Sequence, residues 1–174
     1  MIWFRSVDQR WPFLWEVDLQ PPGRWHGAGE GPAAYLADTP DGAWAEFLRH
    51  EEITDASELG GIERSLWALD VPDQSAGEPL LSDGVLHGGT ESYTHCQEEA
   101  RRLRRLGFSA IEAPSAALLD GGARGENVRG GLVDAGDRDG RVLVLFGEQS
   151  TLRGWLGADG RPRPRLLPLV RPLR

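Results

Sequence analysis

An arginine, a tyrosine and a glutamate stand at equal intervals in the first third of the chain. Arg24, Tyr35 and Glu46 are separated by two steps of eleven residues, within a glycine-rich stretch that begins at Pro21. The Pro-Pro-Gly turn before Arg24 lets the backbone approach a ligand, so that the guanidinium can offer a two-pronged contact to a pyrophosphate. The Tyr35 ring can lie against a flat heterocycle, and Glu46 can face a sugar. These residues predict a site for a nucleotide whose sugar bond is broken.

The nicotinamide–ribose bond of NAD is one bond that suits a single carboxylate. Nicotinamide leaves as a neutral base from a cationic precursor, so no general acid has to protonate it, in contrast to an ordinary glycoside. The transition state resembles an oxocarbenium ion and is stabilised by a negative group beside the ribose. A Glu at the edge of a helix is also common as a solvated side chain, so the spacing alone leaves the assignment of Glu46 open.

The basic residues of the chain are all arginine. Lys and Arg together number 19, and none of them is lysine. This excludes enzymes that form a Schiff base on lysine, including pyridoxal-phosphate enzymes, and it excludes a standard P-loop. Arginine keeps its proton and binds phosphates bidentately. A genome with a biased composition also explains the absence of lysine, and the exclusions hold in either case.

Net charge and cysteine content limit the partners of the chain. The formal net charge is −8, so we do not expect the domain to bind a nucleic-acid backbone directly. No apolar run approaches the length of a bilayer span, and the N-terminus lacks the layout of a signal peptide. The single cysteine, Cys96, excludes an internal disulfide and suits a reducing compartment. We therefore expect a cytoplasmic chain that binds no membrane.

Several common catalytic and metal-binding patterns are absent. The chain contains no G-x-S-x-G, H-E-x-x-H or C-x-x-C. His87, His95 and Cys96 are close in sequence, but their spacing fits no zinc site, and we expect no metal. The glycines of residues 23–31 form no full G-x-G-x-x-G unit, because Pro32 intervenes and no helix follows directly. A dinucleotide fold of the hydride-transfer type is therefore unsupported.

Short strand-like and helix-like segments alternate along the chain and predict an α+β domain. Aromatic and β-branched residues predict strands at residues 2–7, 13–19, 33–38, 65–72, 108–115 and 141–149. Apolar residues recur with the helical period at residues 40–52 and 91–107, with Asp41 as the expected cap of the first helix. Tyr35 is then placed on a strand, and Glu46 at the edge of a helix's apolar face.

The last segment, residues 161–174, is rich in proline and arginine. It holds four prolines and five arginines. Proline at this density excludes a helix and a central strand. We therefore divide the chain into a domain of residues 1–160 and an extension that is either loose or lies extended on the body through Leu166, Leu167, Leu169 and Val170. The extension could block the chain's own site, dock a partner or form an oligomer contact. Separately, the chain has seven tryptophans, which leaves room for an exposed aromatic contact surface and so for a homo-oligomer.

The same residues resemble the RES domain, which is named for Arg, Glu and Ser and is found as the toxin of bacterial toxin–antitoxin pairs. The similar motifs, in the family's order, are "FRS" with Arg5, "GRW" with Arg24 and Trp25, "AYLAD" with Tyr35, "AWAE" with Glu46, and "APSAAL…GEN" with Ser115 and Asn127. The resemblance covers residues 2–145. It departs from the family at His26, where Asn is common, and in the long glycine-rich stretch after Ser115.

The resemblance implies a fold similar to ADP-ribosyltransferases, with a split, twisted β core flanked by helices and NAD in a cleft. Family members consume NAD by hydrolysis, by phosphorolysis or by transfer of ADP-ribose to a protein. By position, Arg5 and Arg24 would hold the phosphates and orient the ribose, and Tyr35 would pack on the nicotinamide. Glu46 would stabilise the cationic sugar, and Ser115 would hydrogen-bond the substrate. Trp25 and Asn127 complete the expected binding set.

The resemblance also implies partners and an alternative. NAD is expected as the substrate, without a metal, and the usual protein partner is an antitoxin, here of the Xre type, whose terminal segment plugs the cleft. The alternative is a catalytically degenerate member that binds a nucleotide or a partner without turnover. Glu46 turned away from Arg24 would favour that alternative.

Overall fold

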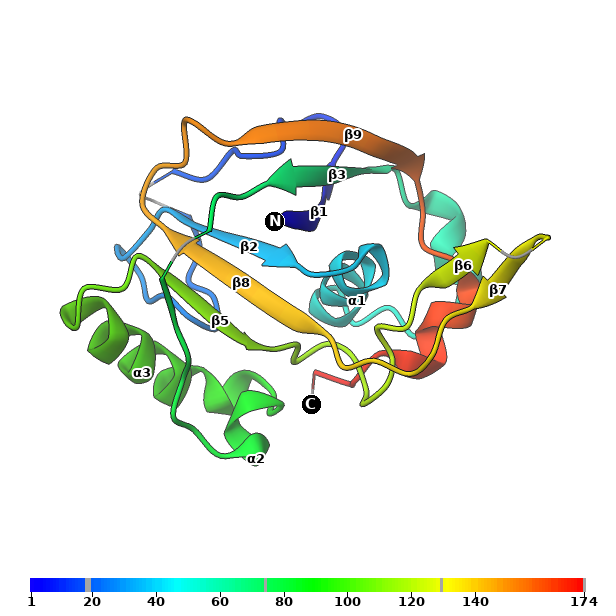
Figure 1. Ribbon diagram of the computed structural model, residues 1–174. Coiled ribbons are helices and arrows are strands. Elements are labelled where there is room, and N and C mark those ends of the chain that lie inside the picture. The colour runs from blue at the N-terminus through cyan, green and yellow to red at the C-terminus, as the bar shows by residue number, and fades with distance from the viewer. Residues whose placement is uncertain (18–19, 74, 129, 174) are drawn as a thin grey trace.

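The computed structural model describes residues 1–17, 20–73, 75–128 and 130–173, and it shows a mixed sheet flanked by helices (Figure 1). Within these ranges the sheet has seven strands in the order β4-β5-β8-β2-β1-β3-β9, in which only the β4–β5 pair is parallel. The strands are β1 (Ile2–Asp8), β2 (Ala33–Ala37), β3 (Arg64–Asp70), β4 (Ala76–Gly77), β5 (Ala110–Pro114), β8 (Arg141–Phe146) and β9 (Arg153–Gly160). The α+β class is confirmed.

Helices and one hairpin complete the described part of the chain. The α-helices are α1 (Pro40–His50), α2 (Asp83–Leu86) and α3 (Tyr93–Arg105), and the 3-10 helices are η1 (Ala56–Gly61), η2 (Thr90–Ser92) and η3 (Pro164–Leu169). The strands β6 (Glu126–Val128) and β7 (Leu132–Asp134) pair only with each other, at the edge of the molecule (Figure 1). No described helix is long and apolar enough to cross a bilayer.

The sheet is nearly divided between β1 and β2. β3 pairs along its length with β1 and β9, and β8 pairs with β2 and β5, whereas β1 and β2 share the register pair Phe4↔Ala37. α1 follows β2 directly and packs beside this joint (Figure 1). Arg5 follows Phe4 on β1, and Tyr35 lies two residues before Ala37 on β2. The narrow joint therefore places both side chains at one point of the sheet.

α1 is fixed at its start by a threonine. Thr39 Oγ1 accepts a hydrogen bond of 3.0 Å from the Gly42 amide, and Pro40 occupies the first turn, where its missing N–H costs nothing. The prediction that Asp41 is the cap is therefore wrong. Asp41 lies in the first turn, where a carboxylate interacts favourably with the helix dipole.

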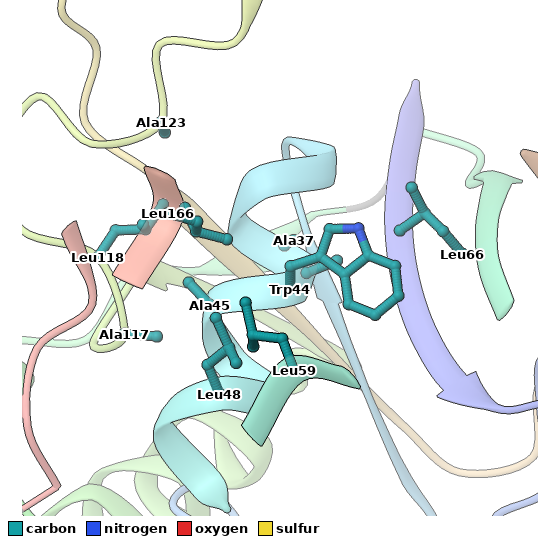
Figure 2. Packing of buried hydrophobic residues seen from close by; sticks show 11 residues of the cluster. Ala37, Trp44, Ala45, Leu48, Leu59, Leu66, Ala117, Leu118, Ala123 and Leu166 are labelled. Atoms are coloured by element: carbon teal, nitrogen blue, oxygen red, sulfur yellow. The ribbon is translucent and has the colours of Figure 1, made fainter. Parts of the chain in front are cut away.

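The apolar side of α1 forms one of the cores. Figure 2 shows Trp44 directed toward Leu66, with Leu118 and Leu166 on the other side of the helix. Leu48 is fully buried in the same cluster. Burial of one such side chain stabilises the fold by roughly 1.5–3 kcal/mol. With this face buried, the helix can hold Glu46, at the edge of the face, in a fixed position.

β8 is buried on both faces, which explains its continuous apolar sequence. Val142 and Val144 face the core that contains α3, and Leu143 and Leu145 face the core on the opposite side of the sheet. Tyr35 is paired with Val144 in the ladder. The strand that supports Tyr35 is therefore among the most constrained parts of the fold.

The predicted strand at residues 13–19 is not formed at residues 13–17, and residues 18–19 lie outside the described part of the chain. The backbone carbonyl of Phe13 accepts a hydrogen bond of 3.0 Å from Arg5 Nη1, and Glu16 forms an ion pair with the same guanidinium. The Phe13 ring packs on Trp67, with centroids 5.2 Å apart. Side-chain contacts thus hold the segment on the sheet in place of a ladder.

The proline-rich tail packs on the body. The expectation that its prolines exclude any helix is wrong, because the segment forms the 3-10 helix η3, with Pro164 in its first turn and Pro168 inside it. Leu166 is buried in the α1 core, and the three other apolar residues named for this segment pack against that core. The Arg171 amide donates to the Ala117 carbonyl at 2.7 Å. The described part of the tail is therefore no loose extension.

Candidate active site

A cavity of about 350 Å³ lies beside the joint between β1 and β2. Five of the seven residues expected to form the site line this first cavity: Arg5, Arg24, Trp25, Tyr35 and Glu46. They come from β1, from the loop before β2, from β2 itself and from α1. Residues that are far apart in sequence thus meet in one hollow.

Ser115 and Asn127 are placed differently. Ser115 is buried, and although its neighbours Pro114 and Ala116 line the first cavity, its hydroxyl donates to Glu46. Asn127 lies in β6 of the separate hairpin, and its side chain is outside the described part of the structure. The expected contacts of both residues with the substrate stay predictions.

A larger cavity, of about 400 Å³, lies between residues 12–16 and 147–152. Its charged lining consists of the carboxylates Glu16 and Glu148, without an arginine. Because Glu16 is paired with Arg5, Glu148 supplies the remaining charge of this lining, and its carboxylate disfavours an anionic nucleotide. The first cavity is therefore the better candidate, although it is smaller.

The Tyr35 hydroxyl is held by two partners. It accepts a hydrogen bond of 2.9 Å from the Trp25 amide and lies 2.8 Å from His26 Nδ1. His26 Nε2 lies 3.0 Å from the Pro21 carbonyl, which can only accept, so Nε2 carries the proton and Nδ1 accepts from Tyr35. Burial lowers the pKa of His26 and raises the pKa of Tyr35 far above its usual range. Both groups are therefore neutral and serve to fix the Tyr35 ring.

Gly23 makes this arrangement sterically feasible. A Cβ atom at this position would lie 2.8 Å from Tyr35 Oη and 2.9 Å from His26 Cε1. Real Cβ atoms essentially never approach that closely. The glycine of the "GRW" motif is thus required by the close approach of its backbone to the phenol.

Glu46 is half-buried at the cavity wall and is oriented by Ser115. Ser115 Oγ donates to Glu46 Oε1 at 3.0 Å. Burial raises the pKa of Glu46, while the Ser115 hydrogen bond and the charges of Arg49 and Arg24 act in the opposite direction. A carboxylate that is poorly solvated and fixed in orientation is suited to stabilise a cation that forms next to it.

Arg24 is buried, and its donors face protein acceptors. Nη1 donates to Ser92 Oγ at 2.9 Å and to the carbonyls of Val85 and Leu86 at 3.2 and 3.4 Å, and Nη2 donates to the Gly88 carbonyl. These acceptors compete with the two-pronged phosphate contact expected from the sequence. With its donors bound to these protein acceptors, Arg24 contributes mainly its positive charge to the cavity wall.

Arg49 is a second buried arginine of the cavity, and the sequence reasoning missed it. Its Nη2 donates to the carbonyls of His87 and Gly88 at 3.1 and 2.7 Å, and its Nε donates to the Pro172 carbonyl at 3.2 Å. The sequence does contain a signal for Arg49. It stands three residues after Glu46, and side chains at this spacing are neighbours on a helix surface.

The tail reaches the same cavity. Leu173 is part of its lining, directly after the carbonyl that Arg49 binds. Arg171 anchors the segment through a hydrogen bond of 2.7 Å from Nε to the Leu118 carbonyl and an ion pair of 2.6 Å with Asp120. The tail thus contributes Leu173 to the wall of the cavity.

No metal site is found in the part of the chain that the structure describes. No three His, Cys, Asp or Glu side chains are grouped there in a way that could hold an ion. Cys96 is a buried free thiol that lies 3.6 Å from Arg24 Nη1, and burial raises its pKa. The thiol is therefore part of the packing around Arg24.

Comparison with known proteins shows the family of the chain. The family model described as the RES domain matches residues 4–128, which is more than half of the chain. The chain belongs to the RES domain family. A probable NAD(+) phosphorylase of Mycobacterium tuberculosis is 34% identical over 105 residues, which make up 56% of this chain and 49% of the relative. This RES chain therefore spans about half the length of the curated relative that it matches.

A solved structure supports the fold of this RES domain. The crystal structure of the M. tuberculosis MbcT–MbcA toxin–antitoxin complex contains a chain that matches with a TM-score of 0.58. The match covers 96% of this chain and 86% of the other, at 16% sequence identity. At that identity the likeness shows a shared fold, and the ADP-ribosyltransferase-like detail stays a prediction.

Proposed function

We propose that this RES domain cleaves the nicotinamide–ribose bond of NAD and is the toxin of a toxin–antitoxin pair. The observation that carries the proposal is the convergence of Arg24, Tyr35 and Glu46 on one cavity of about 350 Å³. This volume is at the lower end for a small-molecule site, so it suits the nicotinamide–ribose end of NAD, with the remainder at the open mouth.

The charge of the cavity supports an anionic ligand. The chain as a whole carries a formal net charge of −8, yet Arg24 and Arg49 are buried side by side at the cavity wall. Neither forms an ion pair with a carboxylate of the described residues. Because a poorly solvated charge acts over a longer range than an exposed one, these two guanidiniums attract the pyrophosphate of NAD.

Glu46 has the central role in the proposed reaction. As the C–N bond lengthens, positive charge develops on the ribose, and the Glu46 carboxylate, held by Ser115, stabilises it. Tyr35 presents its ring to the nicotinamide while its hydroxyl is occupied by Trp25 and His26. Nicotinamide takes the electron pair of the broken bond and leaves as a neutral base.

The attacking group can be water, phosphate or a protein side chain. The curated relative, which is named as a probable NAD(+) phosphorylase, favours phosphate. The structural neighbour, which is solved as a toxin–antitoxin complex, favours a protein antitoxin as the partner. An Xre-type antitoxin bound over the cavity mouth is the arrangement that we propose here.

A degenerate binding module is the second candidate. It would be favoured by Glu46 turned away from Arg24, whereas both residues line the same cavity. This placement favours an enzyme that cleaves NAD over a module that only binds it.

Nicotinamide release tests the proposal. Purified protein is mixed with NAD in buffer alone, with added phosphate, and with added cell protein, and nicotinamide is separated by chromatography. Release in any of the three mixtures is expected, and the mixture that releases it identifies the acceptor. NAD binding without release in all three would establish a degenerate module that binds the nucleotide, and the absence of both would refute the NAD-cleaving enzyme.

A further inference from the structure

A second cavity, of about 310 Å³, adjoins the first at Glu46. The residues that line both are Arg5, Trp15, Tyr35, Glu46, His50 and Val142. At about 3.6 residues per helical turn, Arg49 projects from α1 to one side of Glu46, and Ala43 and Phe47 project to the other side. Arg49 lines the first cavity, and Ala43 and Phe47 line the second. Glu46 therefore stands between two hollows.

The second cavity contains an arginine that the proposed reaction has not used so far. Arg64, on β3, lies over the Phe47 ring with its Cζ 4.1 Å from the ring centroid. Its Nε donates to Ser6 Oγ at 2.9 Å, and its Nη2 donates to the Ser6 carbonyl at 2.8 Å. A guanidinium held flat by a ring and by two hydrogen bonds is already oriented before a ligand arrives.

Arg64 also has donors to spare. Its hydrogen bonds to Ser6 use Nε and Nη2, so within residues 1–17, 20–73, 75–128 and 130–173 Nη1 is left for a ligand. Across the same ranges no carboxylate lies within ion-pair distance of Arg64. Arg5 is the second arginine of this cavity, although Glu16 balances its charge. The acidic residues of the lining are Glu46 and the exposed Glu51.

We propose that the second cavity is the acceptor site of the enzyme and binds inorganic phosphate through Arg64, with Arg5 and the Ser6 hydroxyl beside it. The proposal rests on the proposed function, because it supplies the nucleophile for the same bond. A nucleophile must reach the ribose carbon in line with the leaving group. Two cavities that meet at Glu46 allow nicotinamide to leave through one while phosphate attacks from the other.

The proposed step balances without a further reactant. An oxygen of HPO4²⁻ forms a bond to C1′ of the nicotinamide ribose, and the C1′–N bond breaks. Its electron pair goes to the ring nitrogen, which loses its positive charge. The products are neutral nicotinamide and the 1-phosphate of ADP-ribose, which keeps the phosphate proton until solvent removes it.

Two variants test the site. Arg64→Ala removes the guanidinium, and Ser6→Asp places a carboxylate where Ser6 Oγ now lies 2.9 Å from Arg64 Nε. The second variant keeps β1 and β3 tied by an ion pair while it repels an anion. In both variants the KM for phosphate should rise by about tenfold or more.

Arg105→Ala is the matched control, because it removes one positive charge from an exposed position on α3 that lines neither cavity. Its KM for phosphate should equal that of the wild type. An unchanged KM for phosphate in both Arg64→Ala and Ser6→Asp overturns the site. Wild-type cleavage that phosphate does not stimulate overturns the acceptor proposal, while the proposed NAD cleavage stands.

A binding measurement separates this proposal from the proposed function. Inorganic phosphate is titrated with each protein in the absence of NAD, and the line width of its phosphorus resonance is followed. We expect broadening with the wild type and with Arg105→Ala, and loss of broadening with Arg64→Ala. Equal line widths for the wild type and Arg64→Ala overturn the site even if no variant cleaves NAD.

Discussion

The Ser115 hydroxyl donates a hydrogen bond of 3.0 Å to Glu46 Oε1 and so joins two residues that are 69 positions apart. Ser115 Oγ in turn lies 3.2 and 3.4 Å from the amides of Ala117 and Leu118, which donate to it. The hydroxyl proton is thereby directed to the carboxylate. We infer that the serine of the RES motif acts through Glu46 in this chain, as a positioning residue.

The Ser115→Ala variant should have a lower kcat than the wild type. The acid limb of its profile of kcat against pH should move to higher pH. The hydrogen bond favours the charged carboxylate, so its loss raises the pKa of Glu46 beyond the increase that burial already causes. A loss of about tenfold in kcat is expected for one charge-assisted hydrogen bond. The pH dependence of nicotinamide release measures both effects.

Ser57→Ala is the control for that variant. Ser57 Oγ also donates to a carboxylate, that of Asp55 at 2.7 Å, but at an exposed site. Its pH profile should match that of the wild type. An acid limb that stays in place in Ser115→Ala would count against the positioning role.

Glu46→Gln should lose most turnover and gain stability at neutral pH. Because burial raises the pKa of Glu46 in the folded state, folding favours the protonated form. Burying the charged carboxylate lowers the free energy of unfolding. This loss is absent below the ordinary Glu pKa of about 4.3 and grows as pH rises through the pKa of Glu46 in the folded state. The variant should therefore melt higher than the wild type at pH 8, by about 2–4 °C for each kcal/mol gained, and the difference should shrink toward pH 4.

Thermal melts at several pH values check this prediction. A Glu46→Gln variant that is less stable than the wild type at pH 8 would show that the carboxylate is better solvated or better paired than its surroundings indicate. Retained turnover would remove Glu46 from the proposed mechanism.

Gly23→Ala should weaken NAD binding and lower stability, because the new methyl group would displace the Tyr35 hydroxyl or the His26 ring. Leaving the Trp25 amide without its acceptor costs about 1–3 kcal/mol. Melting temperature and the KM for NAD measure the two effects. Gly84→Ala serves as the control, since a Cβ there meets nothing within 4 Å. A Gly23→Ala protein with the melting temperature and KM of the wild type would contradict this steric argument.

Leu173→Trp should fill the first cavity and raise the KM for NAD by about tenfold or more, with a smaller effect on the melting temperature. The matched control is Leu80→Trp, which adds the same ring at a position that is 80% exposed. An unchanged KM in Leu173→Trp would mean that NAD binds elsewhere or that residue 173 leaves the cavity when NAD enters.

The elements with a regular apolar pattern could be predicted from the sequence. β8 has an unbroken apolar run, and α1 and α3 have the helical period. β9 was missed because its residues are mostly exposed and three of them are glycine, so that neither alternation nor β propensity marks it. The segment at Phe13 has strand-like composition, but Arg5 takes its carbonyl, a tertiary contact that no local pattern reveals.

Where a motif fixed the residue type, the sequence could predict which side chains meet, while their roles toward NAD stay predictions. Arg24, Tyr35 and Glu46 were expected to meet and do line one cavity. Arg49 was missed because its contacts are carbonyls from residues 87–88 and 172, and carbonyls are present at every position of any sequence. The role of Ser115 could not be separated from substrate binding without knowing where its hydroxyl points.

Because the chain is synthesised from its N-terminus, the residues that line the first cavity do not become available at the same time. Tyr35 is backed by β8, and Pro172 and Leu173 complete the wall around Arg49, so a ribosome-bound chain that has reached only α3 has its proposed catalytic residues but no pocket. The activity that we propose would therefore require Leu173 to be synthesised and packed against the body. If the proposed NAD cleavage takes place in the host cell, this order gives a binding partner time to arrive before the cavity is complete.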